Sequence, residues 1–231
     1  MSDLDVKYIT LMTSMPPIKS PFLARQLPIS LLRLAARLRM LDEDDADLLR
    51  RIQAVTEWER IDMGTDEIAV LGAYAALLDD LQSESLRRVV RNRYELRTIV
   101  AAMRRHRLGE SAPEQKAPWG AGRFVDRIRR NWTRPHFGLR RTLPWIAELR
   151  ELYESNQTLD LERLMVRINW NSLVNEMRMH EFDFDAVALY VLRYDIVARW
   201  LGYSADNARR RFDLLVETGL GSHSVLAKEA A

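Results

Sequence analysis

Cysteine is absent from the sequence, which excludes disulfides, thiolate metal sites and cysteine nucleophiles. A chain without disulfides fits a reducing compartment, so we expect a cytoplasmic protein. Long apolar runs are also missing. The two longest uncharged stretches, 8–18 and 68–78, have eleven residues each, whereas a membrane-spanning helix needs about 20. The first residues, MSDLDVK, lack the basic and apolar regions of a signal peptide. The sequence therefore predicts no membrane span.

Glycine and proline are scarce, with nine and eight residues in a chain of 231, and apolar residues recur at helical spacing over long stretches. Apolar residues make up 47% of the chain and charged residues 29%, which is typical of a folded globular protein. We predict an all-α protein, a multi-helix bundle of about eight to nine helices. A short extended segment is expected at 6–17, where β-branched and aromatic residues precede two prolines.

Periodicity and capping residues set the bounds of the predicted helices. These helices cover 28–40, 42–60, 65–80, 83–109, 119–132, 142–155, 158–180, 183–201 and 204–218. Residues 110–118 lack periodicity and contain two prolines, so they are the best candidate for a linker. The prediction is an N-terminal helical half, 1–109, closely packed against a C-terminal half, 119–218, with a frayed tail at 219–231.

Arginine supplies 31 of the 35 basic residues, and eight arginines lie in residues 87–109 against a single acid, Glu95. The apolar residues of this stretch share one face of a helical wheel, about 100° wide, which indicates a helix packed on a core. They are Val89, Leu96, Ile99, Val100 and Met103. Arg87, Arg91 and Arg105 lie together on another side of the helix. Because arginine is a rigid, always-charged donor, these three are candidate partner-binding residues.

A nucleic-acid-binding helical module, using the arginine-rich helices 87–107 and 123–141, is the alternative interpretation. The arginines surround the first of these helices instead of gathering on one face beside aromatic or amide side chains. The net charge of the whole chain is only +2. The sequence therefore predicts nucleic-acid binding that is weak or nonspecific at most.

The helix predicted at 183–201 is apolar almost all round, which is typical of a buried central helix. Asp195 and Arg199 lie four residues apart on it, with the acid nearer the N-terminus, which is the favourable order. We expect these two residues to form a structural ion pair.

Catalytic and metal-binding motifs are missing. The histidines at 106, 136, 180 and 223 have no partner at ligand spacing, and neither an H-E-x-x-H motif nor a Walker A motif occurs. The stretch WGAGRFV, 119–125, carries Gly-x-Gly but has valine in place of the last glycine of a dinucleotide fingerprint. We therefore predict no enzyme activity, no catalytic residues, no cofactor and no bound metal.

Three stretches carry a resemblance to a known family. They are YITLMTSMPP near the N-terminus, NWTRPHFGLRRTLPWI at 131–146, and FDFDAVALYVLRYDIVARWLGYSADNARRRFDLLV at 182–216. Together they resemble an uncharacterised bacterial family encoded among V-type ATPase subunits. That family is distantly similar to the C/d subunits of V-type ATPases, on residues 94–109 and 186–200. The chain departs from the pattern of the C/d subunits at Asp195, where glutamate is usual, and at Trp200, where asparagine is usual.

The resemblance implies a fold like that of the C/d subunits and a function without catalysis. The protein would be a subunit or accessory of a bacterial V-type ATPase that couples or assembles the central stalk and the membrane ring. Its partners would be the central-stalk and membrane-ring subunits, and it would lie in the cytoplasm, peripheral to the inner membrane through protein contacts.

Overall fold

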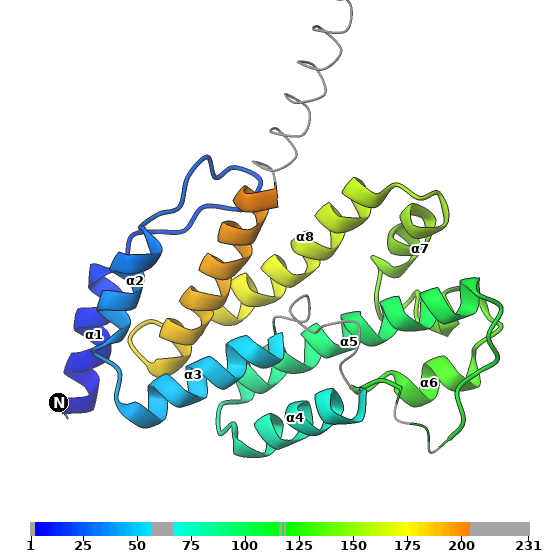
Figure 1. Ribbon diagram of the computed structural model, residues 1–231, viewed down its shortest axis with the longest axis horizontal. Coiled ribbons are helices and arrows are strands. Elements are labelled where there is room, and N and C mark those ends of the chain that lie inside the picture. The colour runs from blue at the N-terminus through cyan, green and yellow to red at the C-terminus, as the bar shows by residue number, and fades with distance from the viewer. Residues whose placement is uncertain (1–2, 57–66, 116, 118, 204–231) are drawn as a thin grey trace, which may run out of the picture.

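The computed structural model describes residues 3–56, 67–115, 117 and 119–203 (Figure 1). Every regular element in these ranges is a helix and none is a strand, which confirms the all-α prediction. The elements in chain order are α1 (Asp3–Ser14), α2 (Leu31–Leu38), α3 (Glu43–Thr56), α4 (Glu67–Asp80), α5 (Glu84–Arg107), α6 (Val125–Arg130), the 3-10 helix η2 (Pro135–Gly138), α7 (Ile146–Glu154) and α8 (Thr158–Met177). Residues 184–203 are also helical.

The N-terminal segment is a helix, so the predicted extended structure at 6–17 is wrong. Leu11 and Met15, one helical turn apart, are both buried in the protein core. The threonine hydroxyls bond back to the same helix, with Thr10 Oγ1 donating to Val6 O at 2.9 Å and Thr13 Oγ1 to Ile9 O at 2.7 Å. Helical packing thus outweighs the preference of β-branched residues for strands.

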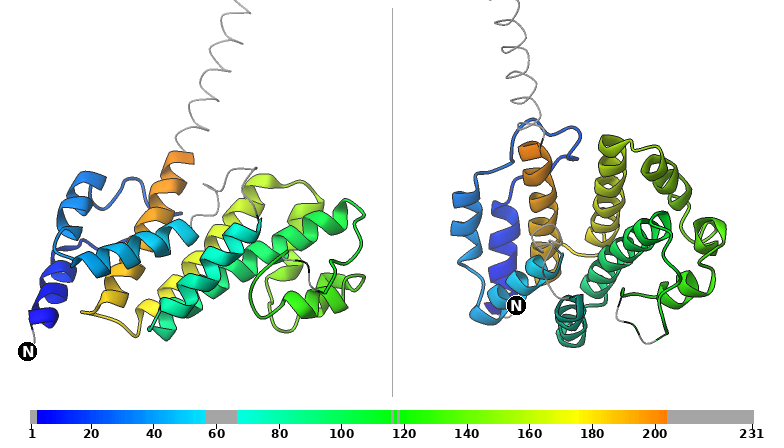
Figure 2. Two further views of the ribbon diagram at one scale, coloured as in Figure 1. Left: turned by 60° about the horizontal axis from the view of Figure 1, so that its bottom comes forward. Right: turned by 45° about the vertical axis from the view of Figure 1, so that its right-hand side comes forward.

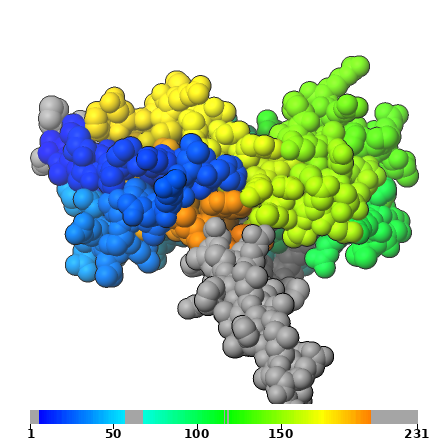
Figure 3. All heavy atoms as spheres, turned by 90° about the horizontal axis from the view of Figure 1, so that it is seen from above, coloured from blue at the N-terminus to red at the C-terminus, as the bar shows by residue number. Residues whose placement is uncertain are grey.

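The described residues form two apolar clusters, which lie one after the other along the long axis of the molecule. The first is built from α1 to α4, the first half of α5, the second half of α8 and residues 184–203. The second is built from the second half of α5, residues 119–149 and the start of α8. Figure 2 shows α1, α2 and residues 184–203 at one end and α6 and α7 at the other. Seen from above, the yellow-green residues of α8 lie between the blue N-terminal helices at one end and the green residues at the other (Figure 3).

Helix α5 joins the two clusters. Tyr94 belongs to the first cluster and Leu96, two residues later, to the second. The helix starts at an N-cap, Ser83, whose side chain accepts a hydrogen bond from Leu86 N at 3.1 Å, and Gly109 follows it with φ +76°. A capping serine and a left-handed glycine are usual at the two ends of a helix. Both ends of α5 thus agree with the bounds predicted from the sequence.

Residues 119–123 run along α5, although the sequence predicted a helix from 119. Thr98 Oγ1 donates to Ala121 O and accepts from Ala121 N, both at 2.9 Å. A Cβ on Gly120 would lie 2.5 Å from Thr98 Cγ2, and a Cβ on Gly122 would lie 2.3 Å from Glu95 Cγ. The two glycines therefore serve close backbone approach to α5, which accounts for the Gly-x-Gly pattern.

Several predictions from the sequence fall outside the described residues. They are the end of the helix 42–60, the start of the helix 65–80, the helix 204–218 and the tail 219–231. The division into halves at 110–118 stays a prediction. Across the described ranges, no helix is long and apolar enough to cross a bilayer.

Candidate functional site

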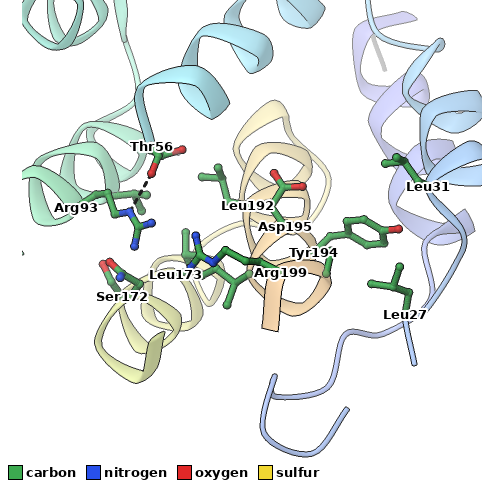
Figure 4. Close-up of a pocket in the computed structure, with 14 residues that line it drawn as sticks. Leu27, Leu31, Thr56, Arg93, Ser172, Leu173, Leu192, Tyr194, Asp195 and Arg199 are labelled. Atoms are coloured by element: carbon green, nitrogen blue, oxygen red, sulfur yellow. Dashed lines mark hydrogen bonds between the residues drawn. The ribbon is translucent and has the colours of Figure 1, made fainter. Parts of the chain in front are cut away.

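A cavity of about 510 Å³ lies where α5, α8 and residues 184–203 meet the segment before α2 (Figure 4). Its size is typical of ligand-binding pockets. Most of its walls are apolar, and a few polar groups converge on it. The lining residues are Leu27, Leu31, Thr56, Val89, Arg93, Asn169, Ser172, Leu173, Leu192, Tyr194, Asp195, Ile196, Ala198 and Arg199.

Arg93 is the most deeply buried charge in the cavity, with 9% of its surface exposed. Its Nε donates a hydrogen bond of 2.9 Å to the carbonyl oxygen of Thr56 in α3 (Figure 4). The guanidinium of Arg93 therefore connects α5 to α3 at the wall of the cavity.

Asp195 and Arg199 both lie on this cavity, and their side chains leave the helix in different directions in Figure 4. The Asp195 carboxylate accepts a hydrogen bond of 2.7 Å from Gln53 Nε2 of α3. Asp195 thus ties residues 184–203 to α3, a contact across 142 positions of sequence that helical spacing alone could not predict. The ion pair with Arg199 stays a prediction.

Leucines stand exposed along the segment that borders the cavity. Leu23, Leu31 and Leu32 are 75%, 66% and 83% exposed, and Leu31 also lines the cavity. In helix α2 only Leu34 is buried. Leu31 and Leu32 are adjacent in α2, and exposed apolar side chains that lie together mark surfaces that bind other molecules.

The candidate partner-binding arginines are all partly buried on α5. Arg87 Nε donates to Leu81 O at 2.6 Å, and Arg105 Nε lies 3.8 Å from Glu110 Oε2. Burial raises the pKa of Tyr74 to about 12, and the positive charge of Arg91 opposes that increase. Two of the three predicted arginines therefore contact the chain itself.

Other arginines of the two arginine-rich stretches are also engaged within the protein. Arg88 forms two hydrogen bonds with Glu176, Nε to Oε1 at 3.0 Å and Nη2 to Oε2 at 2.8 Å. Arg123 holds the buried carboxylate of Glu95 through its backbone N, Nε and Nη2, at 2.9, 2.8 and 3.0 Å. Arg107 binds the carbonyl of Tyr153 at 3.1 Å. These arginines, which belong to the two arginine-rich stretches of the sequence, thus connect separate parts of the fold through hydrogen bonds.

A Ser-His-Asp arrangement occurs at the start of α5, and sequence reasoning missed it. Ser85 Oγ lies 2.8 Å from His180 Nε2, and His180 Nδ1 lies 2.7 Å from Asp183 Oδ2. These distances match a catalytic triad, but Ser85 is only 6% exposed and its Oγ also accepts a 3.1 Å hydrogen bond from Arg88. The arrangement joins α5 to the turn between α8 and residues 184–203. The separation of 95 positions hides it from motif analysis.

A family model matches residues 46–218, well over half of the chain. The chain belongs to the family described as protein of unknown function, DUF2764. No curated protein and no solved structure matches it, so the likeness to the C/d subunits rests on the sequence stretches alone.

The matched range of this DUF2764 protein includes most of the cavity, from Thr56 through Arg93 to Arg199, whereas Leu27 and Leu31 precede it. In the described ranges, no group of three histidine, aspartate or glutamate side chains is placed to hold a metal ion. What the cavity offers is an apolar recess with polar groups inside and leucines at its border.

Proposed function

We propose that this protein is a non-catalytic subunit or accessory protein of a bacterial V-type ATPase, and that it couples or assembles the central stalk and the membrane ring. The partner class comes from the resemblance of residues 8–17, 131–146 and 182–216. The structural observation that supports a protein-binding role is the exposure of Leu23, Leu31 and Leu32, of which Leu31 lines the cavity.

The leucines can supply much of the free energy of association. Full burial of one leucine contributes about 1.5–3 kcal/mol. Leu23, Leu31 and Leu32 are 66–83% exposed, and a partner that covers all three gains several kcal/mol. Micromolar binding requires about 8 kcal/mol after the cost of association. An amphipathic helix of a partner protein, with one apolar side chain in the cavity, fits this surface.

The proposed coupling role draws support from α5. This helix has 24 residues, which corresponds to a length of roughly 36 Å, and both apolar clusters are built on it. A helix packed along its whole length transmits force between its ends without bending, because protein interiors are close-packed. A partner at each end would be held at a fixed separation.

A nucleic-acid-binding module is less well supported. Arg88, Arg93, Arg107 and Arg123 donate to carboxylates or carbonyls of the protein itself. Phosphate contacts require cations that are free to leave such bonds, so we retain the protein-binding proposal.

Affinity purification of the tagged protein from detergent-solubilised membranes tests the proposal. We expect wild type to recover ATPase subunits, and the double variant Leu23→Ser/Leu32→Ser to recover far less. Loss of about 3 kcal/mol of leucine burial lowers affinity by more than a hundredfold. Leu108→Ser is the matched control, since Leu108 is 68% exposed and follows the C-terminal end of α5, outside the cavity lining. Equal recovery by the double variant would show that the leucines do not form the contact.

A further inference from the structure

The backbone is strained at residues 136–138, in the stretch 131–146. His136 and Phe137 have φ values of +53° and +52°, and Gly138 follows with +67°. Left-handed residues other than glycine are costly and persist only where the surrounding structure holds them. Phe137 is held, because its ring is 1% exposed and lies 5.5 Å from the ring of Trp132. Arg127 Nη2 also donates to Gly138 O at 2.6 Å.

His136 is oriented by this backbone, and one of its ring nitrogens is buried without a hydrogen bond. Nδ1 has no hydrogen-bond partner within the described part of the chain. Buried polar atoms in native proteins are nearly always paired, so an exception calls for an explanation. Burial lowers the pKa of His136, and the positive charges of Arg150 and Arg140 lower it further. This lowering of the pKa favours the uncharged imidazole.

An open cavity of about 680 Å³ lies beside His136, and its lining carries both signs of charge. Thr133, Pro135, His136, Arg140, Ala147, Arg150, Glu151, Glu154 and Ser155 form the lining. Arg150 Nε donates to Glu154 Oε1 at 2.6 Å. Arg134, Arg140 and Arg141 are exposed around the same loop. These exposed arginines differ from those of α5, most of which face other parts of the protein.

We propose that this concavity, between the loop 133–140 and helix α7, binds an acidic segment of a partner protein, with a carboxylate held by the exposed Arg140. Planar guanidinium groups match carboxylates in pairs of parallel hydrogen bonds. The proposal deepens the proposed function, on which the identity of the partner rests. The surface itself rests on the geometry of the loop.

A protein segment fits this surface better than a nucleic acid. Glu151 and Glu154 line the same concavity, and the backbone N–H groups of a bound peptide can donate to them, whereas the phosphates of a nucleic acid offer only acceptors. Bases would also need exposed aromatic rings for stacking, but Trp132 and Phe137 beside the loop are 7% and 1% exposed.

Fluorescence anisotropy with a labelled peptide of alternating glutamate and alanine tests the surface on the full-length protein. The peptide should bind, and Arg140→Ala should weaken binding about tenfold to hundredfold, since a charged hydrogen-bonded pair is lost. Arg104→Ala is the control, because Arg104 is exposed on α5 outside the concavity. A peptide with glutamine in place of glutamate should not bind. Unchanged melting temperatures of both variants show that the fold is intact.

Equal weakening by Arg140→Ala and Arg104→Ala would reduce the effect to net charge and overturn the proposal. A labelled oligonucleotide that binds more tightly than the peptide, with the same dependence on Arg140, would also overturn it. Should the peptide bind as expected while tagged protein recovers no ATPase subunit, the surface stands and the proposed function falls. Should Arg140→Ala leave both peptide binding and ATPase recovery unchanged, the surface falls and the proposed function stands.

Discussion

Replacing Gly122 by alanine should destabilise the protein severely, because it strikes the contact between residues 119–123 and α5. The new Cβ would lie 2.3 Å from Glu95 Cγ, a distance at which one side must move. Glu95 cannot move freely, since it is 4% exposed and its carboxylate accepts three hydrogen bonds from Arg123. The substitution therefore breaks this cluster of hydrogen bonds.

The magnitude has two parts. Gly122 has φ +98°, and a left-handed conformation costs an L-residue about 1–2 kcal/mol. Displacing the Glu95 carboxylate loses hydrogen bonds to a charged group, worth about 1.5–3 kcal/mol; the lower half of that range applies because the Arg123 side chain is 59% exposed and screened by water. The sum is about 2.5–4 kcal/mol, a large part of the stability of an ordinary domain.

Urea unfolding followed by circular dichroism measures the loss, and two other glycines provide controls. Gly109 has φ +76° with open space around its Cβ position, so Gly109→Ala should cost only the backbone part, about 1–2 kcal/mol. Gly72 lies within α4, also in open space and without a positive φ, so Gly72→Ala should stabilise by about 0.5–1 kcal/mol. Equal losses for Gly122→Ala and Gly109→Ala would refute the proposed clash with Glu95.

Two further predictions concern side chains that join helices. The hydrogen bonds from Arg88 lower the pKa of Glu176 below its ordinary value of 4.5, so its contribution to stability is present above that pH and is lost as pH falls through the lowered pKa. Glu176→Gln should therefore have a lower melting temperature than wild type at neutral pH, and the difference should shrink on acidification; a constant difference would contradict the assignment. Asp195→Ala should lower the free energy of unfolding by about 1–3 kcal/mol, because the Gln53 amide loses its hydrogen-bond acceptor. Glu110→Ala, at an exposed position, should have little effect. Identical urea midpoints for the two variants would show that Asp195 does not tie residues 184–203 to α3.

The sequence alone predicts the bounds of a helix where capping residues mark its ends. Ser83 and Gly109 limit α5 in the structure as their residue types predict, because capping depends on residues close together in the chain. The N-terminal helix α1 was mistaken for extended structure, because Tyr8, Ile9 and Thr10 favour strands locally. Burial of Leu11 and Met15 in the core decides the outcome instead.

The candidate site was less predictable than the fold. Asp195 and Arg199 could be singled out because charges are rare in an apolar helix, and both do lie on the cavity. The hydrogen bond from Gln53 to Asp195, and Leu27 and Leu31 on the same cavity, come from segments far away in sequence. The intramolecular contacts of the α5 arginines could not be predicted for the same reason. Whether Arg87 is free or bound depends on the carbonyl of Leu81, which a helical wheel does not contain.

Site-specific photo-cross-linking in living cells tests the central claim most directly. A photoreactive amino acid replaces Leu32, which is 83% exposed and follows the cavity-lining Leu31 in α2, and a second strain carries it at Leu108 as the control. The account predicts that position 32 cross-links to a protein of the V-type ATPase central stalk or membrane ring, and that position 108 does so far less. If the protein substituted at position 32 forms no cross-link to an ATPase subunit in cells that assemble the ATPase, the proposed function is contradicted.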